Sequence, residues 1–442
     1  MATIWIGIDD TDSPRGGCTT WVLTELVRLA RDGGIDLIGE PRLVRLNPNV
    51  PWKTRGNAAL AARFGRGQGS PYLVGEVGGA SILAYPRGSG LPRREAAAFR
   101  DAAWRRVQAL AAPVPYSDPA LVASSTALPG SLYWSAVREV VPVGARAAAL
   151  DRLGADCRTN GSRRGLIGAS AAIAWPGRRA TWEVIAYREP ARWGTPREVD
   201  AESVRRAQRA EPELFLCHDA RTRRLLVAPH SPCPILFGLR STGRDAPVRA
   251  RARVLSEPVE RWMVFRTNQG TGDHLRPRPA EAIAPYFSAI VQGTVASAPR
   301  AEAGGHVHFD VIDATSERVP CLAFEPTKTL PKVAQSLVVG DRVRVWGSRG
   351  RAPGLRLEGI AIVRLVARTA TENPRCPDCR RPTRSRGHRR GFECPGCRRR
   401  WPPESERIVR RAPEFPAGTY HPTPSARRHL AVLAPEVETA RA

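Results

Sequence analysis

Three carboxylates stand close together near the amino end of this 442-residue chain. Asp9, Asp10 and Asp12 follow an apolar run over residues 4–8, which predicts a strand that ends at the carboxylates. Such carboxylates repel one another unless a cation lies among them, and oxygen ligands that share phosphates suit Mg²⁺. The segment therefore indicates a magnesium and phosphate site, although the same residue types also form ordinary turns and helix caps.

Paired glycines and paired hydroxyls come directly after the carboxylates. Gly16, Gly17, Thr19 and Thr20 precede an apolar pattern with helical spacing over residues 21–30. Backbone N–H groups at the start of a helix attract anions, so this loop is a candidate phosphate-binding element. It is not a Walker A loop, because the Gly-Lys-Ser/Thr ending is missing.

A second candidate for nucleotide binding is the proline-rich loop of residues 46–57, which carries Lys53, Arg55 and Asn57. The chain has 68 lysines and arginines, and only three of them are lysine. Lysine is a compact point charge, so its use at position 53 favours contact with a nucleotide phosphate. The alternative is an ordinary surface lysine.

The composition indicates an acidic polymer as partner. The formal net charge is +26 and the isoelectric point is near 11.1. No run of eighteen apolar residues predicts a membrane span, and the amino end lacks the pattern of an export signal. We therefore expect a cytoplasmic protein with no membrane partner, and the length predicts about three domains or more.

The most specific motif lies near the carboxyl end. Cys376, Cys379, Cys394 and Cys397 form two Cys-x-x-Cys knuckles, which predict a structural Cys₄ zinc ribbon rather than a redox dithiol. Residues 375–411 contain thirteen arginines, with Phe392 and Trp401 among them. This combination favours binding of a nucleic-acid backbone, with a solvated basic face as the alternative.

The patterns along the chain predict a multidomain α+β protein. Residues 290–366 alternate in short apolar runs of period two and have Gly and Asp at the corners, which predicts a five-stranded OB-fold barrel. The front half mixes helical and strand patterns, which indicates an α/β or α+β domain followed by a ferredoxin-like domain. The predicted domains are residues 1–135, 136–284, 285–370, 371–403 (the ribbon) and 404–442, a basic tail that either contacts RNA or is disordered.

Motifs spread over the whole sequence carry a family resemblance. They comprise residues 7–13 with 18–20, residues 46–57, residues 164–169, residues 265–271, and the barrel followed by the ribbon. In this order they resemble the archaeal tRNA(Ile) 2-agmatinylcytidine synthetase family over nearly the full length.

The resemblance implies a ligase with an ATP-binding, kinase-like first domain. Such an enzyme modifies the wobble cytidine of a CAU-anticodon tRNA(Ile) with agmatine, so that the tRNA decodes AUA. A phosphoryl group from ATP activates the cytosine O2, and the amine of agmatine then displaces it. The implied cofactors are ATP, Mg²⁺ and Zn²⁺, and no DNA partner is expected.

The resemblance also implies roles for single residues. The family's phosphorylated threonine falls on Thr19, with Thr20 as the second choice. The three aspartates would hold Mg²⁺ and ATP phosphates, and Lys53 or Arg55 would steady the transferred charge. The remaining expected cofactor-binding residues are Gly16, Gly17, Thr20, Arg55 and Asn57.

The binding site for the amine is less specified. Glu183, Tyr187, Asp219 and Asp273 are candidates that the sequence does not rank. Two other functions stay open: an RNA-binding protein without catalysis, built on the barrel and ribbon, and an ATP-dependent RNA-modifying enzyme that uses a different amine.

Overall fold

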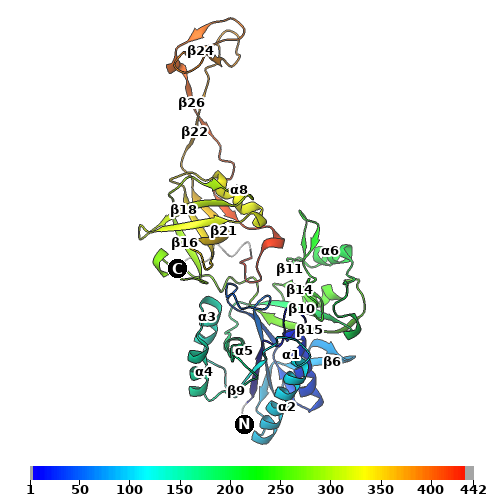
Figure 1. The fold of residues 1–442 in the computed structure, drawn as a ribbon. Helices are drawn as coiled ribbons and strands as arrows, with labels where there is room; N and C mark the ends of the chain where they lie inside the picture. The colour runs from blue at the N-terminus through cyan, green and yellow to red at the C-terminus, as the bar shows by residue number, and fades with distance from the viewer. Residues whose placement is uncertain (1–2, 434–442) are drawn as a thin grey trace.

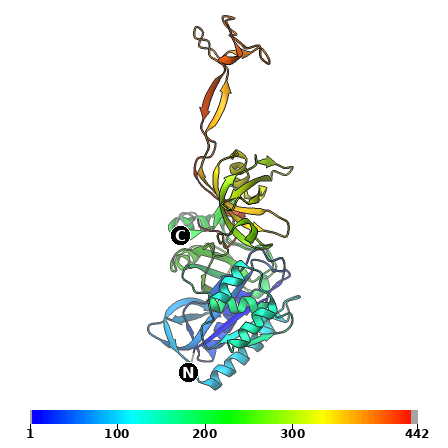
Figure 2. The ribbon, with the colours of Figure 1, turned by 90° about the vertical axis from the view of Figure 1, so that its left-hand side faces the viewer.

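The chain forms a large α+β base, a β-barrel above it and a small module at the end of a thin stalk (Figure 1). The computed structural model describes residues 3–433. Seen from the side, the stalk extends well away from the barrel (Figure 2). Among the residues described, no helix has the length and apolar character needed to cross a membrane.

The base is built around one 13-stranded sheet, in the order β11-β14-β10-β15-β5-β6-β2-β4-β1-β8-β9. Strand β3 pairs with both β15 and β4, and β7 pairs with β4. The strands are β1 Ile4–Asp9, β2 Asp36–Ile38, β3 Arg42–Arg45, β4 Ala58–Gln68, β5 Tyr72–Val77, β6 Ala80–Tyr85, β7 Arg87–Ser89, β8 Ala120–Ser124, β9 Asp156–Thr159, β10 Thr181–Arg188, β11 Leu214–Phe215, β14 Ile235–Ser241 and β15 Val259–Thr267.

Helices bury the apolar faces of this sheet. Two of them, α1 (Thr19–Asp32) and α2 (Arg93–Ala111), pack into one core cluster with β1 and β4. Helices α3 (Ser131–Arg138), α4 (Val143–Arg152) and α5 (Gly165–Ala174) share a second cluster. A third cluster lies under α6 (Ala201–Ala210) and α7 (Ala246–Arg251). The apolar spacing over residues 133–153 is typical of one helix, but the structure has two, because Pro142 lacks an N–H group and precedes the first residue of α4.

The two predicted front domains contribute strands to one sheet. The break expected between residues 135 and 136 falls inside α3, and β9 from the second part pairs with β8 from the first. Strand β15 likewise pairs with β5 and β3. The sheet is therefore continuous through both parts, and their separation into two domains stays a prediction.

A β-barrel is confirmed in the segment where the sequence predicts one, with its long strands within residues 288–364, and the bounds 285–370 stay a prediction. Its strand β16 pairs with both β18 and β20, which closes the sheet, and β19 runs parallel to β21. The elements are β16 Ser288–Val295, β17 Arg300–Ala301, β18 Val307–Asp313, β19 Arg318–Ala323, α8 Thr329–Ser336, β20 Arg342–Arg349 and β21 Leu355–Arg364. Alternate side chains fill its interior.

The chain leaves the barrel through a two-stranded stalk of β22 (Arg368–Glu372) and β26 (Arg407–Arg411). The module at its tip has three short strands, β23 Arg384–Ser385, β24 Phe392–Glu393 and β25 Arg400–Trp401. After the stalk, β27 (Gly418–Tyr420) joins the barrel beside β21. The chain then runs back into the base. We call residues 421–433 the return segment.

Short elements complete the structure. A hairpin of β12 (His218–Asp219) and β13 (Arg224–Leu225) projects from the base. The apolar run of residues 225–228 predicts a strand, and only its first residue belongs to one, the short β13. The 3₁₀ turns are η1 Pro190–Arg192, η2 Ala280–Ala282, η3 Glu325–Thr327, η4 Pro403–Ser405 and η5 Pro424–Ala426.

Candidate active site

A cavity of about 590 Å³ lies in the base where the return segment meets the sheet. Its walls come from the end of β1, the start of α1, the loop of residues 46–57, strands β10 and β14, the β12–β13 hairpin and residues 424–429. The sequence predicts ten residues for catalysis or nucleotide binding, and eight of them line this cavity. The other two, Gly16 and Gly17, accept hydrogen bonds from Arg55, which is one of the eight.

Asp9 is the last residue of strand β1 and Asp10 follows it, and both line the cavity. The backbone N–H of Asp10 donates to Asp9 Oδ1 at 2.8 Å, and Asp10 adopts a left-handed conformation with φ +55°. Burial raises the pKa of Asp9 well above its ordinary value, and the charges of Asp10 and Asp12 raise it further. Burial, with repulsion from Asp12 and Asp118, raises the pKa of Asp10 to about 6. This pair of carboxylates therefore favours a cation.

Helix α5 fits closely against the same two carboxylates. A Cβ atom placed on Gly168 would lie 1.8 Å from Asp9 Oδ2, and one on Gly165 would lie 3.2 Å from Asp10 Oδ2. The glycines at these positions let the helix approach the strand end. The two glycines of the motif of residues 164–169 therefore allow α5 to pack directly against Asp9 and Asp10.

Asp12 forms an ion pair with Arg55. Its Oδ2 lies 2.6 Å from Arg55 Nη2, and the same guanidinium donates to the Gly17 carbonyl at 2.8 Å and the Gly16 carbonyl at 3.2 Å. Gly17 has φ +72°, and a Cβ there would lie 2.9 Å from the Thr11 carbonyl oxygen, so the turn requires glycine. Arg55 therefore holds the glycine turn and Asp12 in place.

The two threonines at the start of α1 differ in their contacts. Both are buried and line the cavity. The Thr20 hydroxyl lies 2.9 Å from Cys18 Sγ, whereas the Thr19 hydroxyl has no side-chain hydrogen bond among residues 3–433. The geometry thus leaves the Thr19 oxygen free to react.

Lys53 and Asn57 lie in the loop that forms one side of the cavity mouth. Lys53 donates to the Pro48 carbonyl, and its pKa is lowered by burial and by Arg428. Asn57 donates to the Asn47 carbonyl at 2.6 Å, and the Leu46 N–H donates to the Asn57 carbonyl at 2.9 Å. Asn57 therefore closes the loop, while Lys53 stands at its exposed edge.

Glu183 lines the cavity and belongs to a hydrogen-bonded row of polar side chains. Arg240 Nε donates to Glu183 Oε1 at 3.1 Å, and Gln269 Nε2 donates to Glu183 Oε2 at 2.5 Å. The Gln269 Oε1 then faces His429 Nδ1 of the return segment at 2.8 Å. Both oxygens of Glu183 are thus already paired.

The other three candidates for amine binding lie outside the lining of the cavity. Asp219 accepts backbone N–H groups from Arg221 and Ser425, and Asp273 accepts from the Tyr133 hydroxyl at 2.5 Å. Tyr187 is fully buried in the core beneath α1. Among these four candidates, Glu183 alone borders the cavity.

The four cysteines gather at the tip of the stalk. Their sulfur atoms all lie within 4.8 Å of one another, as ligands of one tetrahedral zinc ion would. Backbone N–H groups of the second knuckle lower the pKa of the Cys394 thiol to about 7, which favours the thiolate that zinc binds. Among residues 3–433 this is the one group of three or more potential metal ligands whose atoms lie close enough together to hold an ion.

Several residues of the cavity were not predicted from the sequence. Arg45 and Arg240 come from β3 and β14, and Arg164 stacks over the Trp52 ring at 4.3 Å. His429 also lines the cavity, and its partner Gln269, 160 residues earlier in the chain, lies outside the lining. No short sequence motif contains these residues together, because only the folded chain brings them to one site.

Three family models match the chain. They are the TiaS TCKD domain over residues 5–160, the TiaS FLD domain over residues 163–274 and the TiaS C-terminal zinc ribbon domain over residues 373–412. The matched ranges include the aspartates, both threonines and the four cysteines.

Curated relatives match over nearly their whole length. The tRNA(Ile) 2-agmatinylcytidine synthetase TiaS of Methanosarcina acetivorans is 34% identical over 96% of each chain. The protein of the same name from Methanocaldococcus jannaschii is 31% identical over 97% of this chain and 98% of its own.

Solved structures agree in fold. A complex of TiaS with tRNA(Ile) and ATP superimposes with a TM-score of 0.81 at 31% identity, covering 99% of this chain and 97% of the other. A complex of TiaS with tRNA(Ile), AMPCPP and agmatine gives a TM-score of 0.79 at 29% identity, covering 100% of this chain and 98% of the other.

Proposed function

The chain belongs to the tRNA(Ile) 2-agmatinylcytidine synthetase (TiaS) family, and from this premise we propose that it attaches agmatine to the wobble cytidine of a CAU-anticodon tRNA(Ile). It is an ATP-dependent enzyme, and the modified tRNA decodes AUA. The observation that carries this function is the cavity that joins the buried aspartates, the free hydroxyl of Thr19 and the polar row at Glu183. ATP, cytidine and amine must meet at one site, and the volume of about 590 Å³ lies in the range of small-molecule binding sites.

The aspartate end of the cavity suits the phosphates of ATP. Asp9 and Asp10 would hold Mg²⁺, whose remaining ligands come from phosphate oxygens and water, since Mg²⁺ is usually bound through one or two carboxylates. The raised pKa values of both carboxyl groups fit this role, because a nearby cation would relieve their repulsion. Asp12 instead orients Arg55, and through it the turn of Gly16 and Gly17.

The reaction needs two transfers. An amide-like carbonyl has no leaving group, so a phosphoryl group on the cytosine O2 supplies one, and attack by the agmatine amine on C2 then expels phosphate. Phosphoryl transfer depends mainly on positioned charge, and Mg²⁺ would neutralise the phosphate oxygens when bound. We assign Thr19 as the residue that itself becomes phosphorylated, with Lys53 close enough to the mouth to contact the transferred group.

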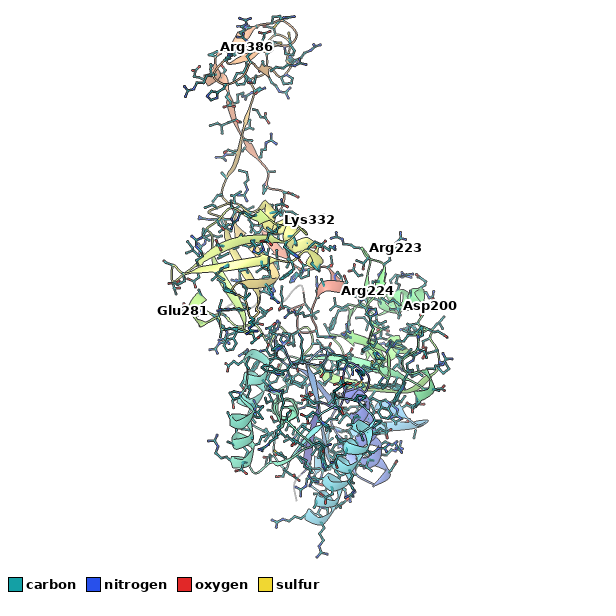
Figure 3. The ribbon with its side chains drawn as sticks, in the orientation of Figure 1. Asp200, Arg223, Arg224, Glu281, Lys332 and Arg386 are labelled. Carbon is teal, nitrogen blue, oxygen red and sulfur yellow. The ribbon has the colours of Figure 1, made fainter. Side chains whose placement is uncertain are left out.

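The remaining domains fit a large RNA partner. We interpret the first part of the base as kinase-like, the second as ferredoxin-like and the barrel as an OB fold, with one helix between its third and fourth long strands. Basic side chains occur at each level of the molecule: Arg223 and Arg224 on the β12–β13 hairpin of the base, Lys332 on α8 of the barrel and Arg386 on the ribbon (Figure 3). A Cys₄ zinc ion would fix the two knuckles that carry the outermost arginines.

The test is a labelling experiment with the full-length protein. Incubation with γ-labelled ATP, unmodified CAU-anticodon tRNA and either agmatine or other amines should give agmatine incorporation and protein-bound phosphate. Binding of the tRNA without any label transfer would leave the RNA-binding alternative, and preferential incorporation of another amine would leave the third alternative.

A further inference from the structure

His429 is a cavity residue that the reaction as described does not yet use. It lies in the return segment, which the base holds by backbone hydrogen bonds: Gly270 N–H donates to the His429 carbonyl at 2.8 Å, and Gly272 N–H donates to the Leu430 carbonyl at 2.9 Å. The Leu430 side chain is 2% exposed in the core of the base. The imidazole is therefore held firmly at the wall of the cavity.

The hydrogen-bond row fixes which nitrogen of His429 carries the proton. Glu183 accepts from the amide nitrogen of Gln269, so the Gln269 oxygen must face the imidazole. An oxygen can only accept, so His429 Nδ1 donates. A neutral imidazole then has a lone pair on Nε2. Within the described residues Nε2 has no hydrogen-bond partner, and its edge borders Gly56 at the cavity.

The surroundings keep this imidazole neutral and disfavour a cation beside it. Burial lowers the pKa of His429 well below its ordinary value, and the charges of Arg45 and Arg240 lower it further. The other charged groups nearby are Glu183, which is paired with Arg240 and Gln269, and Arg428, which is paired with Glu358. A third cation such as the ammonium or guanidinium group of agmatine would be repelled here, so a neutral N–H donor is the better partner.

We propose that His429 Nε2 accepts a hydrogen bond from the exocyclic amino group of the target cytidine and thereby distinguishes cytidine from uridine. This proposal rests on the proposed function. Cytosine presents an N–H donor at the position where uracil presents a carbonyl oxygen. An unprotonated nitrogen acceptor would bind the amino group of cytosine and repel the carbonyl oxygen of uracil. Enzymes that move a base out of the stack into a pocket recognise it by such hydrogen bonds.

The test compares two kinds of deletion in a double-mutant cycle. One is His429→Asn, which keeps an amide nitrogen for Gln269 and removes the Nε2 acceptor. The other is a tRNA whose wobble base is pyrimidin-2-one, which keeps the reactive C2 carbonyl and lacks the amino group. The measurement is kcat/KM for incorporation of labelled agmatine. For the wild-type enzyme we expect removal of the amino group to lower it about 10- to 100-fold.

For His429→Asn the two tRNAs should react within about twofold of each other, because the contact is already missing. His429→Gln can place its amide oxygen near the Nε2 position and should restore part of the discrimination. His421→Asn is the matched control, since His421 lies in the same segment against Trp346 and outside the cavity lining. It should discriminate like the wild type.

Equal discrimination by the wild type and His429→Asn would overturn the proposal. A higher KM for agmatine in His429→Asn, with discrimination between the tRNAs intact, would also overturn it and would assign the imidazole to the amine. Failure of the wild type to incorporate agmatine into the normal tRNA would instead reject the proposed function.

Discussion

The Cys₄ cluster and the aspartate cluster are built in opposite ways. The four cysteines come from 22 consecutive residues, and their sulfur atoms already lie within 4.8 Å of one another. Asp9, Asp10 and Asp12 are even closer in sequence, yet Asp12 forms an ion pair with Arg55. A structural metal site is complete within its own segment, whereas the site that we propose at the aspartates would leave ligand positions for its substrate.

The two clusters also differ in what surrounds them. Short strands and exposed arginines surround the cysteines at the tip of the stalk. Segments from the whole chain surround the aspartates, from α5 at Gly168 to the return segment at His429. Damage to the first cluster should therefore weaken RNA binding, and damage to the second should stop the chemistry.

The largest expected effect is that of Asp9→Asn. This change removes one charge from the buried pair and keeps the shape of the side chain. We expect agmatine incorporation to fall about 10²- to 10³-fold, which is typical for the loss of one positioned group that stabilises the transition state. Asp32→Asn at the exposed end of α1 is the control and should stay near wild type. Full activity of Asp9→Asn would remove the aspartates from the mechanism.

The two threonines offer a narrower test of the same end of the cavity. Thr19→Ala should abolish protein-bound label from γ-labelled ATP, because its hydroxyl is the free one. Thr20→Ala loses the contact with Cys18 and should still be labelled. Mass spectrometry of the phosphopeptide identifies the residue directly, and a phosphate on Thr20 would reverse our assignment.

Local patterns predicted the parts of the site that depend on neighbours in sequence. The end of β1, the glycine turn and the start of α1 lie where residues 4–20 indicated, and the spacing of Cys376 to Cys397 predicted the ribbon. Nothing in the sequence indicates that Arg55 bonds the glycine turn or that Asn57 bonds the Asn47 carbonyl, because only the fold brings these groups near, and the cofactor-binding roles of both stay predictions. His429 was missed for the same reason: its partner Gln269 is 160 residues away.

Removal of zinc tests the other cluster. Cys394→Ser, or a chelator, should disorder the knuckles that hold the tip arginines. We expect the affinity for tRNA to fall about tenfold or more, and the dependence of the affinity on salt to become shallower, because phosphate contacts are lost. ATP hydrolysis should change much less. Equal losses of both would show that the ribbon supports the whole fold.

A smaller effect is expected from the close contact between α5 and β1. Gly168→Ala adds a methyl group 1.8 Å from Asp9 Oδ2, and such overpacking costs about 1–3 kcal/mol of stability. Gly144→Ala in α4 is the matched control: its added Cβ meets no atom within 4 Å, so it should stabilise the protein by about 0.4–1 kcal/mol. Urea denaturation measures both. Equal effects of the two changes would show that α5 can move away from Asp9.

The smallest expected effect concerns the point where the return segment leaves the barrel for the base. Burial and the charge of Arg427 lower the pKa of His421 to about 4, and its Nε2 is buried without a hydrogen-bond partner in the described part of the chain. The folded protein therefore keeps His421 neutral between pH 4 and 6.5, while the unfolded chain takes up a proton there. This contribution to stability is complete above pH 6.5 and is lost as the pH falls towards 4.

His421→Phe keeps an aromatic ring beside Trp346 and removes the titration. We expect Tm to fall less between pH 7 and 5 in this variant than in the wild type. The pKa of Glu358 is lowered to about 2, so its protonation reduces stability only below about pH 4.5. It therefore does not affect the change in Tm between pH 7 and 5. Parallel Tm curves would show that His421 is hydrated. A shallower dependence of Tm on pH in His421→Phe would show that water is excluded around His421. The connection between barrel and base would then be well packed, as is needed to hold His429 at the cavity.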